Sequence, residues 1–181
     1  MKTIETKSFS YKELSQEAKA KVLQRLSEQA DLDFEQQDML KSMKAICEES
    51  NLRLYDWSFG SYCRNWKAKV SGNAEDLEGN RAVAWFLRIL IRKGYERPKK
   101  FKDMKFPGIC GFTGMCYNDD FAQEIYDRLI EGNTVRKAFD FMADRACGMC
   151  EKELEYKKSE ECILDYLDQD EEIYTEDGNE F

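Results

Sequence analysis

The sequence predicts an α+β fold that is mainly helical, with a small antiparallel sheet, in a single compact domain spanning residues 1–181. Three observations lead to this prediction. Apolar residues recur at helical spacing through most of the chain, whereas residues 61–70 alternate between polar and apolar side chains. Hydrophobic residues make up 42% of the 181, enough for a buried core and too many for an intrinsically disordered chain. No internal repeat or low-complexity linker divides the sequence.

Residues 10–50 are predicted to form a helical hairpin. Ser15 is a candidate N-cap, and the apolar residues that follow it recur at helical spacing over 16–29. A second apolar face of helical period predicts another helix at about 34–50. Because only a short link separates the two helices, we expect them to pack against each other.

Residues 52–70 are predicted to form a β-hairpin. The segment SYCRNWKAKV, residues 61–70, has the two-residue period of a half-buried strand. The segment LRLYDWSF, residues 52–59, is a plausible partner strand, with a Gly-Ser pair between them. This hairpin is the predicted antiparallel sheet.

Residues 79–181 are predicted to contain helices and an acidic C-terminal segment. A helix at about 79–93 is apolar around most of its circumference, which is typical of a helix central to a core. The glycine-rich segment 108–120 is predicted to hold a strand that leads into a helix at 120–131.

Two further helices are predicted after that segment. One begins after Thr134 and the other after Ser159, since each of these residues is a candidate N-cap before an apolar helical stripe. Near the end of the chain, Asp177 and Gly178 predict a turn between two short extended pieces.

The net charge of −8 is distributed unevenly. Residues 151–181 hold 13 Asp and Glu against 3 Lys, whereas the other 150 residues hold 25 basic and 23 acidic groups. Within the latter, residues 88–105 form a basic band with eight Lys and Arg against two carboxylates. The acidic end can present carboxylates to a partner's basic groove, and the basic band can meet nucleic-acid phosphates. An acidic chain is a poor match for free duplex DNA, which we do not expect as a partner.

Neither a membrane nor an export pathway is expected. The longest strongly apolar run, residues 82–91, is too short to span a bilayer and contains Arg88. The first ten residues have no apolar stretch of the kind found in secretory signals. Seven cysteines are an odd number, which favours reduced thiols over a disulfide framework. These features predict a cytoplasmic protein.

The sequence contains no histidine, which excludes His-dependent triads and His zinc ligands. Neither a GxxxxGK[ST] nor a GxGxxG nucleotide motif is present. Asp119 and Asp120, with Glu124, could form a carboxylate cluster for Mg²⁺ or Ca²⁺. Acidic residues are also expected at the start of any helix, where they cap it and favour its dipole. We therefore predict no catalytic residues, no cofactor and no enzymatic activity.

Four cysteines could instead form a zinc site, which is the alternative to a protein without a metal. Cys110 and Cys116 are spaced C-x5-C, and Cys147 and Cys150 are spaced C-x2-C, so the four thiols could bind zinc if the pairs met in space. The second pair lies within a predicted helix, however, and not on the turn that zinc pairs usually occupy. A thioredoxin-like role would require a strand before this pair, where a helix is predicted. Buried free cysteines with no chemical role are also common.

Four stretches of the chain resemble a family of small proteins from phages and bacterial mobile elements. They are SYKELSQEAKAKVLQRL (10–26), DWSFGSYCRNWKAKV (56–70), FTGMCYNDDF (112–121) and EYKKSEECILDYLDQDEEIYTEDG (155–178). The order W-S-x-G-x-Y, T-G-x-C, Y-T-E-D-G runs through most of the chain. Within this group the sequence most resembles the type II anti-CRISPR proteins, which inhibit Cas9.

The resemblance implies a non-enzymatic protein that evades host defence by binding Cas9, in its complex with guide RNA, and blocking target-DNA binding or cleavage in the bacterial host cell. Cas9 holds nucleic acid in positively charged channels, which acidic side chains could occupy. The candidate partner-binding residues are Asp119, Asp120, Asp165, Asp168, Asp170, Glu171, Glu172, Glu176 and Asp177. The candidate contacts to guide-RNA phosphates are Arg97, Lys99, Lys100 and Lys102.

Two other functions stay open at the sequence level. One is a zinc-stabilised regulatory or interaction module of a mobile element, which would use the four cysteines. The other is an enzyme that depends on a cysteine or on metal-bound carboxylates, such as a nuclease. The missing histidines and nucleotide motifs make this last possibility the weakest.

Overall fold

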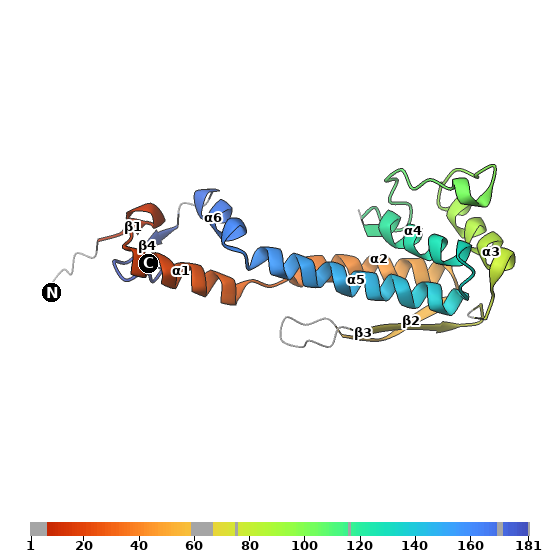
Figure 1. The fold of residues 1–181 in the computed structure, drawn as a ribbon, viewed down its shortest axis with the longest axis horizontal. Coiled ribbons are helices and arrows are strands. Elements are labelled where there is room, and N and C mark those ends of the chain that lie inside the picture. Colours follow the sequence, from red (N-terminus) through yellow and green to blue (C-terminus); the bar gives the residue numbers. More distant parts are fainter. Residues whose placement is uncertain (1–6, 59–66, 75, 116, 170–171, 181) are drawn as a thin grey trace. The chain divides into compact units, whose positions relative to one another are not determined.

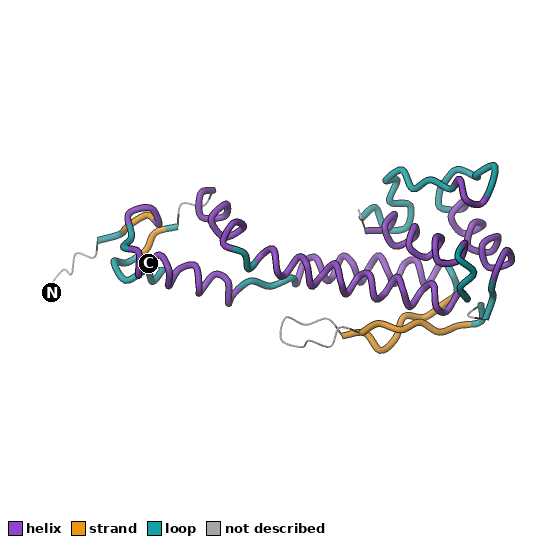
Figure 2. The backbone as a smooth tube through the Cα atoms, viewed as in Figure 1, coloured by secondary structure: helices purple, strands orange, loops and turns teal. Residues whose placement is uncertain are grey.

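A computed structural model describes residues 7–58, 67–74, 76–115, 117–169 and 172–180. It is mainly helical, with two separate two-stranded antiparallel sheets, and the predicted α+β class is confirmed (Figures 1 and 2). Within the described ranges, none of the helices combines the length and the apolar character that crossing a membrane requires. The elements are β1 (Phe9–Ser10), η1 (Tyr11–Glu13), α1 (Gln16–Gln29), α2 (Asp33–Glu49), β2 (Leu52–Ser58), β3 (Lys67–Gly72), α3 (Gly79–Arg92), η2 (Phe101–Asp103), α4 (Tyr117–Ile130), α5 (Val135–Lys157), α6 (Glu160–Gln169) and β4 (Ile173–Tyr174).

The chain divides into two compact units. Unit 1 combines the two ends of the chain, residues 1–31 and 152–181, and unit 2 consists of residues 32–151. Helix α5 contributes residues to both units. That residues 1–181 form a single domain stays a prediction.

The apolar core of unit 1 is built from both ends of the chain. Helices α1 and α6 contact each other, and β1 pairs antiparallel with β4, with Phe9 opposite Tyr174. The buried core residues are Leu14, Ala18, Val22, Ile163, Leu167 and Tyr174. Helix α1 begins where the sequence predicts, because the Ser15 hydroxyl accepts a hydrogen bond from the Ala18 N–H at 3.2 Å. Its apolar face, expected to pack on the second helix of a hairpin, is covered by α6 and β4.

The predicted turn at Asp177 and Gly178 is confirmed. Gly178 has φ +81°, and its N–H donates to the Thr175 carbonyl at 2.9 Å. A Cβ atom at this position would lie 2.8 Å from the Ala18 carbonyl oxygen, so only glycine allows the turn to approach α1 so closely. Arg25 of α1 donates to the Gly178 carbonyl at 3.2 Å, which fixes the turn further.

Unit 2 has a larger core, to which helices α2 to α5 and strand β2 contribute. Phe139 of α5 meets Phe86 of α3 edge to face, with ring centroids 5.9 Å apart, and both side chains are fully buried. Helix α3 packs on α4 through one buried face, and Arg81, Arg88 and Arg92 are exposed. A central place for this helix in the core stays a prediction. The strands of the predicted hairpin pair antiparallel, with Leu52 opposite Gly72, and their connection lies outside the described residues.

The strand predicted within residues 108–120 is wrong. The described part of this segment forms turns, and α4 begins at Tyr117, three residues before the predicted start. Gly108, Cys110 and Gly114 have φ angles of +79°, +49° and +80°. An extended strand needs negative φ at every residue, so these left-handed positions prevent one from forming.

Candidate functional site

The net charge of the whole chain resides in unit 1. This unit holds 17 Asp and Glu against 9 Lys and Arg, whereas unit 2 holds 19 of each. Apart from Glu151, the acidity that the sequence shows after residue 150 therefore belongs to one folded unit. A folded unit of one net sign attracts surfaces of the opposite sign.

The predicted carboxylates of unit 1 differ in how far they are already engaged. Asp165, Glu176 and Asp177 are exposed and form no hydrogen bond or ion pair within the described residues. Asp168 is exposed too, but it pairs with Lys12 at 2.8 Å. Asp170 and Glu171 lie outside the described residues. In addition, Glu160 and Glu161, which the sequence reading omitted, are exposed in the first turn of α6.

Glu172 accepts two hydrogen bonds inside unit 1. The Tyr166 hydroxyl donates to its Oε1 at 2.8 Å, and the Tyr174 hydroxyl donates to its Oε2 at 2.5 Å. Burial, followed by this bond to Glu172, raises the pKa of Tyr174, so its hydroxyl remains a donor at neutral pH. Because Glu172 joins α6 to β4, we assign it to holding unit 1 together and not to binding a partner.

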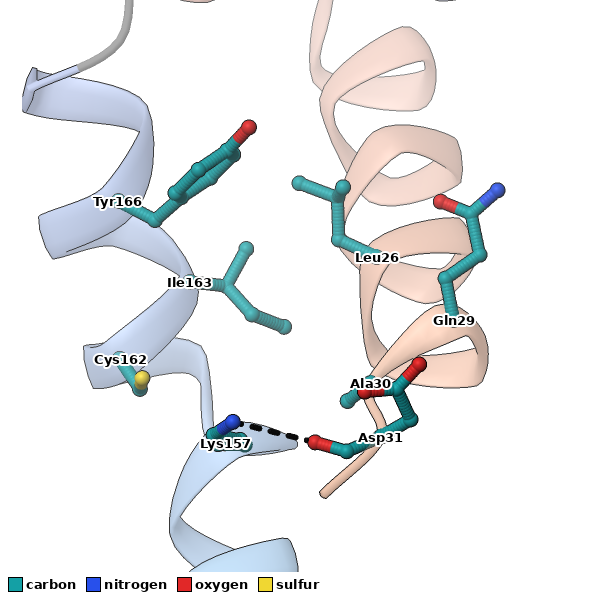
Figure 3. Close-up of a pocket in the computed structure, with 8 residues that line it drawn as sticks. All are labelled: Leu26, Gln29, Ala30, Asp31, Lys157, Cys162, Ile163 and Tyr166. Atoms are coloured by element: carbon teal, nitrogen blue, oxygen red, sulfur yellow. Dashed lines mark hydrogen bonds between the residues drawn. The ribbon is translucent and has the colours of Figure 1, made fainter. Parts of the chain in front are cut away.

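An apolar groove lies between α1 and α6 (Figure 3). Its volume is about 370 Å³, and Leu26 of α1 faces Ile163 and Tyr166 of α6 across it. The remaining lining residues are Gln29, Ala30, Asp31, Lys157 and Cys162. The Lys157 ammonium donates to the Asp31 carbonyl at 3.2 Å and closes one end.

The predicted RNA-contacting residues lie in unit 2, in a segment that we name the basic loop, residues 97–105. Its side chains Arg97, Lys99, Lys100 and Lys102 are all exposed, as is Lys105, which the site prediction omitted. Within the described residues none of these five cations forms a hydrogen bond or an ion pair. The aromatic ring of Phe101, 37% exposed, lies among them in the sequence.

Aromatic residues of neighbouring segments hold the backbone of the basic loop in place. The Tyr126 hydroxyl of α4 donates to the Phe101 carbonyl at 2.9 Å. After the loop, the Phe106 ring packs edge to face against Tyr95 and against Tyr126, with centroids 5.6 and 6.0 Å away. The loop is therefore attached to α4 by a hydrogen bond and by ring contacts.

Asp119 is buried and holds the chain that follows the basic loop. Its Oδ1 accepts from the Tyr95 hydroxyl at 2.5 Å and from the Cys110 N–H at 3.1 Å, and its Oδ2 accepts from the Gly108 N–H at 2.6 Å. Burial, then this contact with Asp119, raises the pKa of Tyr95. Asp119 is 8% exposed, so we remove it from the candidate partner-binding set and assign it a structural role.

The neighbouring carboxylates of α4 have cationic partners. Asp120 lies 3.6 Å from the Arg145 guanidinium, and Glu124 bonds to Arg145 at 3.2 Å and to Arg128 at 2.7 Å. In the part of the chain that the structure describes, no group of three or more Cys, Asp or Glu side chains is placed to hold a metal ion. The possible Mg²⁺ or Ca²⁺ cluster at these residues is thus an ion-pair network with arginines.

The structure places three of the four candidate zinc ligands and leaves Cys116 outside the described residues. Cys147 and Cys150 both lie within α5 and are buried, and the Cys150 sulfur is 3.3 Å from the sulfur of Met39. Burial, helped by Asp144, raises the pKa of Cys147 to about 11. Because metal binding and nucleophilic attack both require the thiolate, this thiol is poorly suited to either.

The two adjacent aspartates of α4 provide a matched test of the structural role of Asp119. An amide at position 119 would turn an NH₂ group towards at least one of the three donors, so Asp119→Asn should lower the free energy of unfolding by about 2–4 kcal/mol. Asp120→Asn removes only a half-exposed ion pair and should cost less than about 1 kcal/mol. Urea denaturation of both variants measures the difference, and equal stability would remove the role assigned to Asp119.

The cysteines should differ in their rates of alkylation. Iodoacetamide at about pH 8 should modify half-buried Cys110 and Cys162 at least about tenfold faster than Cys47 and Cys147. Burial raises the pKa of Cys47 to about 12 and that of Cys147 to about 11, so both stay protonated at this pH and become reactive only as pH rises towards those values.

Mass spectrometry of the individual peptides gives the rates. Alkylation of Cys147 as fast as that of Cys162 would contradict the prediction. A joint increase at Cys110 and Cys147 after a chelator is added would instead indicate a shared zinc ion.

Comparisons with known proteins give no match. No protein-family model, no curated protein and no solved structure is similar enough to the chain to match it.

Proposed function

We propose that the chain is a non-enzymatic anti-CRISPR protein that binds Cas9 loaded with guide RNA and blocks the binding or cleavage of target DNA. It would act in the cytoplasm of the bacterial host. The resemblance of four sequence stretches to type II anti-CRISPR proteins suggests this function. The observation that supports it best is the concentration of the entire net charge of −8 in unit 1, which is a folded acidic surface.

An acidic folded surface can compete with nucleic acid for a basic channel. The channels of Cas9 are positively charged because they hold nucleic-acid backbones. Asp165, Glu176 and Asp177 can face such a channel without breaking any internal bond, since they have no partner among the described residues. Asp168 would first have to give up its ion pair with Lys12, which is exposed and therefore weak.

The basic loop supports the choice of the guide-loaded complex over Cas9 alone. Its five exposed cations are also unpaired within the described residues, and they would be repelled by the positive channel that attracts unit 1. Phosphates of a bound guide RNA provide the negative charge that these cations need. A protein with RNA already bound offers both a positively charged channel and negatively charged phosphates.

The placement of the reactive side chains favours binding over catalysis. Cys47 and Cys147 have raised pKa values, and the carboxylates Asp119, Asp120 and Glu124 are engaged by protein donors. The zinc-stabilised module also receives less support. Its candidate ligands Cys147 and Cys150 are buried within a continuous helix and not on a turn. We therefore rank the protein-binding inhibitor first.

Neutralising the unpaired carboxylates of unit 1 should weaken inhibition. In a DNA-cleavage assay with guide-loaded Cas9, the triple variant Asp165→Asn, Glu176→Gln, Asp177→Asn should require at least about tenfold more protein for half inhibition, because long-range attraction is lost. The effect should shrink as salt is added, since salt screens exposed charges.

A second triple variant serves as the control. It removes the same number of exposed carboxylates from unit 2, at Glu48→Gln, Asp76→Asn and Asp144→Asn. This control should inhibit like the unchanged chain. If a panel of type II Cas9 proteins, with and without guide RNA, neither binds the chain nor loses cleavage activity, the proposed function is wrong.

A further inference from the structure

The basic loop combines an exposed aromatic ring with exposed cations that come before and after it in the sequence. Lys99 and Lys100 precede Phe101, and Lys102 follows it. Surfaces that bind single-stranded nucleic acid use this combination, in which a base stacks on the ring and the cations contact the flanking phosphates. Contacts to guide-RNA phosphates alone would use the cations and not this ring.

The local charge balance of the loop favours an anion. Residues 97–105 hold five cations against one carboxylate, Asp103. At physiological salt a charge acts over about 8 Å, so the charges around Phe101 matter more than the net charge of the chain. Because none of these cations has a partner among the described residues, a phosphate need not displace an internal carboxylate.

The loop is also held in place before any ligand binds. The Tyr126 hydroxyl bonds to the carbonyl of Phe101 itself, at 2.9 Å, and Asp119 accepts from the Gly108 and Cys110 amides just beyond the loop. A side chain whose backbone is fixed loses less conformational freedom on binding. The ring of Phe101 is therefore exposed on a segment whose backbone is already held in place. Covering this ring with a stacked base would remove apolar surface from water, which is favourable.

We propose that the basic loop binds single-stranded RNA, with an unpaired base stacked on Phe101 and the adjacent phosphates on Lys99, Lys100 and Lys102. This inference rests on the proposed function, because it specifies how the loop would contact guide RNA. It also requires an unpaired base, which contacts to phosphates alone do not require. Bases inside a duplex stack on one another, so the ring can receive only a base that is unpaired.

Fluorescence anisotropy with the full chain alone tests the inference without Cas9. The probes are a labelled oligouridine of about 12 nucleotides and an RNA duplex of the same length, at about 50 mM salt. The single strand should bind more tightly than the duplex. Phe101→Leu should weaken single-strand binding about tenfold, and Phe101→Trp should preserve it, because leucine lacks the aromatic face.

A charge series measures the contribution of the phosphates. The variant Lys99→Gln, Lys100→Gln, Lys102→Gln should reduce the slope of log affinity against log salt by about 2, as expected for three lost phosphate contacts to a single strand. The matched control changes three exposed cations elsewhere in unit 2, namely Arg53→Gln, Arg81→Gln and Lys137→Gln. The control should leave both the slope and the affinity unchanged.

Three results would overturn the inference: undetectable binding of the oligouridine, equal binding by the Phe101→Leu variant and the unchanged chain, or equal losses in the two triple variants. Circular dichroism of each variant ensures that a loss does not reflect unfolding. Because Cas9 is absent, failure of this test leaves the inhibition assay intact. Conversely, if the chain binds the oligouridine but does not bind Cas9, the RNA-binding inference is supported and only the proposed function is wrong.

Discussion

The contact between α1 and α6 is the constraint on which unit 1 depends. Each helix has one apolar face, and neither can bury that face alone, so Val22 and Ile163 from opposite ends of the chain share one core with Tyr174. The same amphipathic packing sets which side chains face solvent. With the apolar side of α6 buried, Glu161 and Asp165 remain exposed. The acidic surface is thus a direct consequence of how the two ends of the chain fold together.

Two physical classes stand out among the described carboxylates. Asp119 and Glu172 each accept hydrogen bonds from protein donors in places where a loop or a strand must be held. Asp165 and Asp177 are exposed and have no partner among the described residues. Burial and the number of donors around each group separate structural carboxylates from those available to a partner. The same criterion identifies the exposed cations of the basic loop as free to bind.

The helices could be predicted from the sequence because their signals are local. Ser15 caps α1 as expected, and the apolar residues of α3 form a buried face in unit 2. The pairing of β1 with β4 could not be predicted, since a two-residue strand has no periodicity and its partner lies at the other end of the chain. A strand is predicted within residues 108–120 where the described residues 108–115 form turns, although the spacing of Gly108, Gly111 and Gly114 is a signal for turns.

The candidate site could be predicted only in part, for a related reason. Asp119 and Asp120 are the same residue type at adjacent positions, and only the tertiary donors around Asp119 distinguish them. Glu172 likewise looks like any other carboxylate of the acidic end until Tyr166 and Tyr174 are placed beside it. The composition of the basic band was evident from the sequence, but the fixed backbone beneath Phe101 was not, because Tyr126 is distant in the chain.

In the proposed function, unit 1 contacts Cas9 and the basic loop contacts the guide RNA bound to it. Hydrogen–deuterium exchange of the chain, measured alone, with Cas9 and with guide-loaded Cas9, tests it most directly. We expect slower exchange within residues 160–177 in the presence of guide-loaded Cas9, and slower exchange within residues 97–105 only when the guide is present. Unchanged exchange in both segments, or protection confined to other parts of the chain, would contradict it.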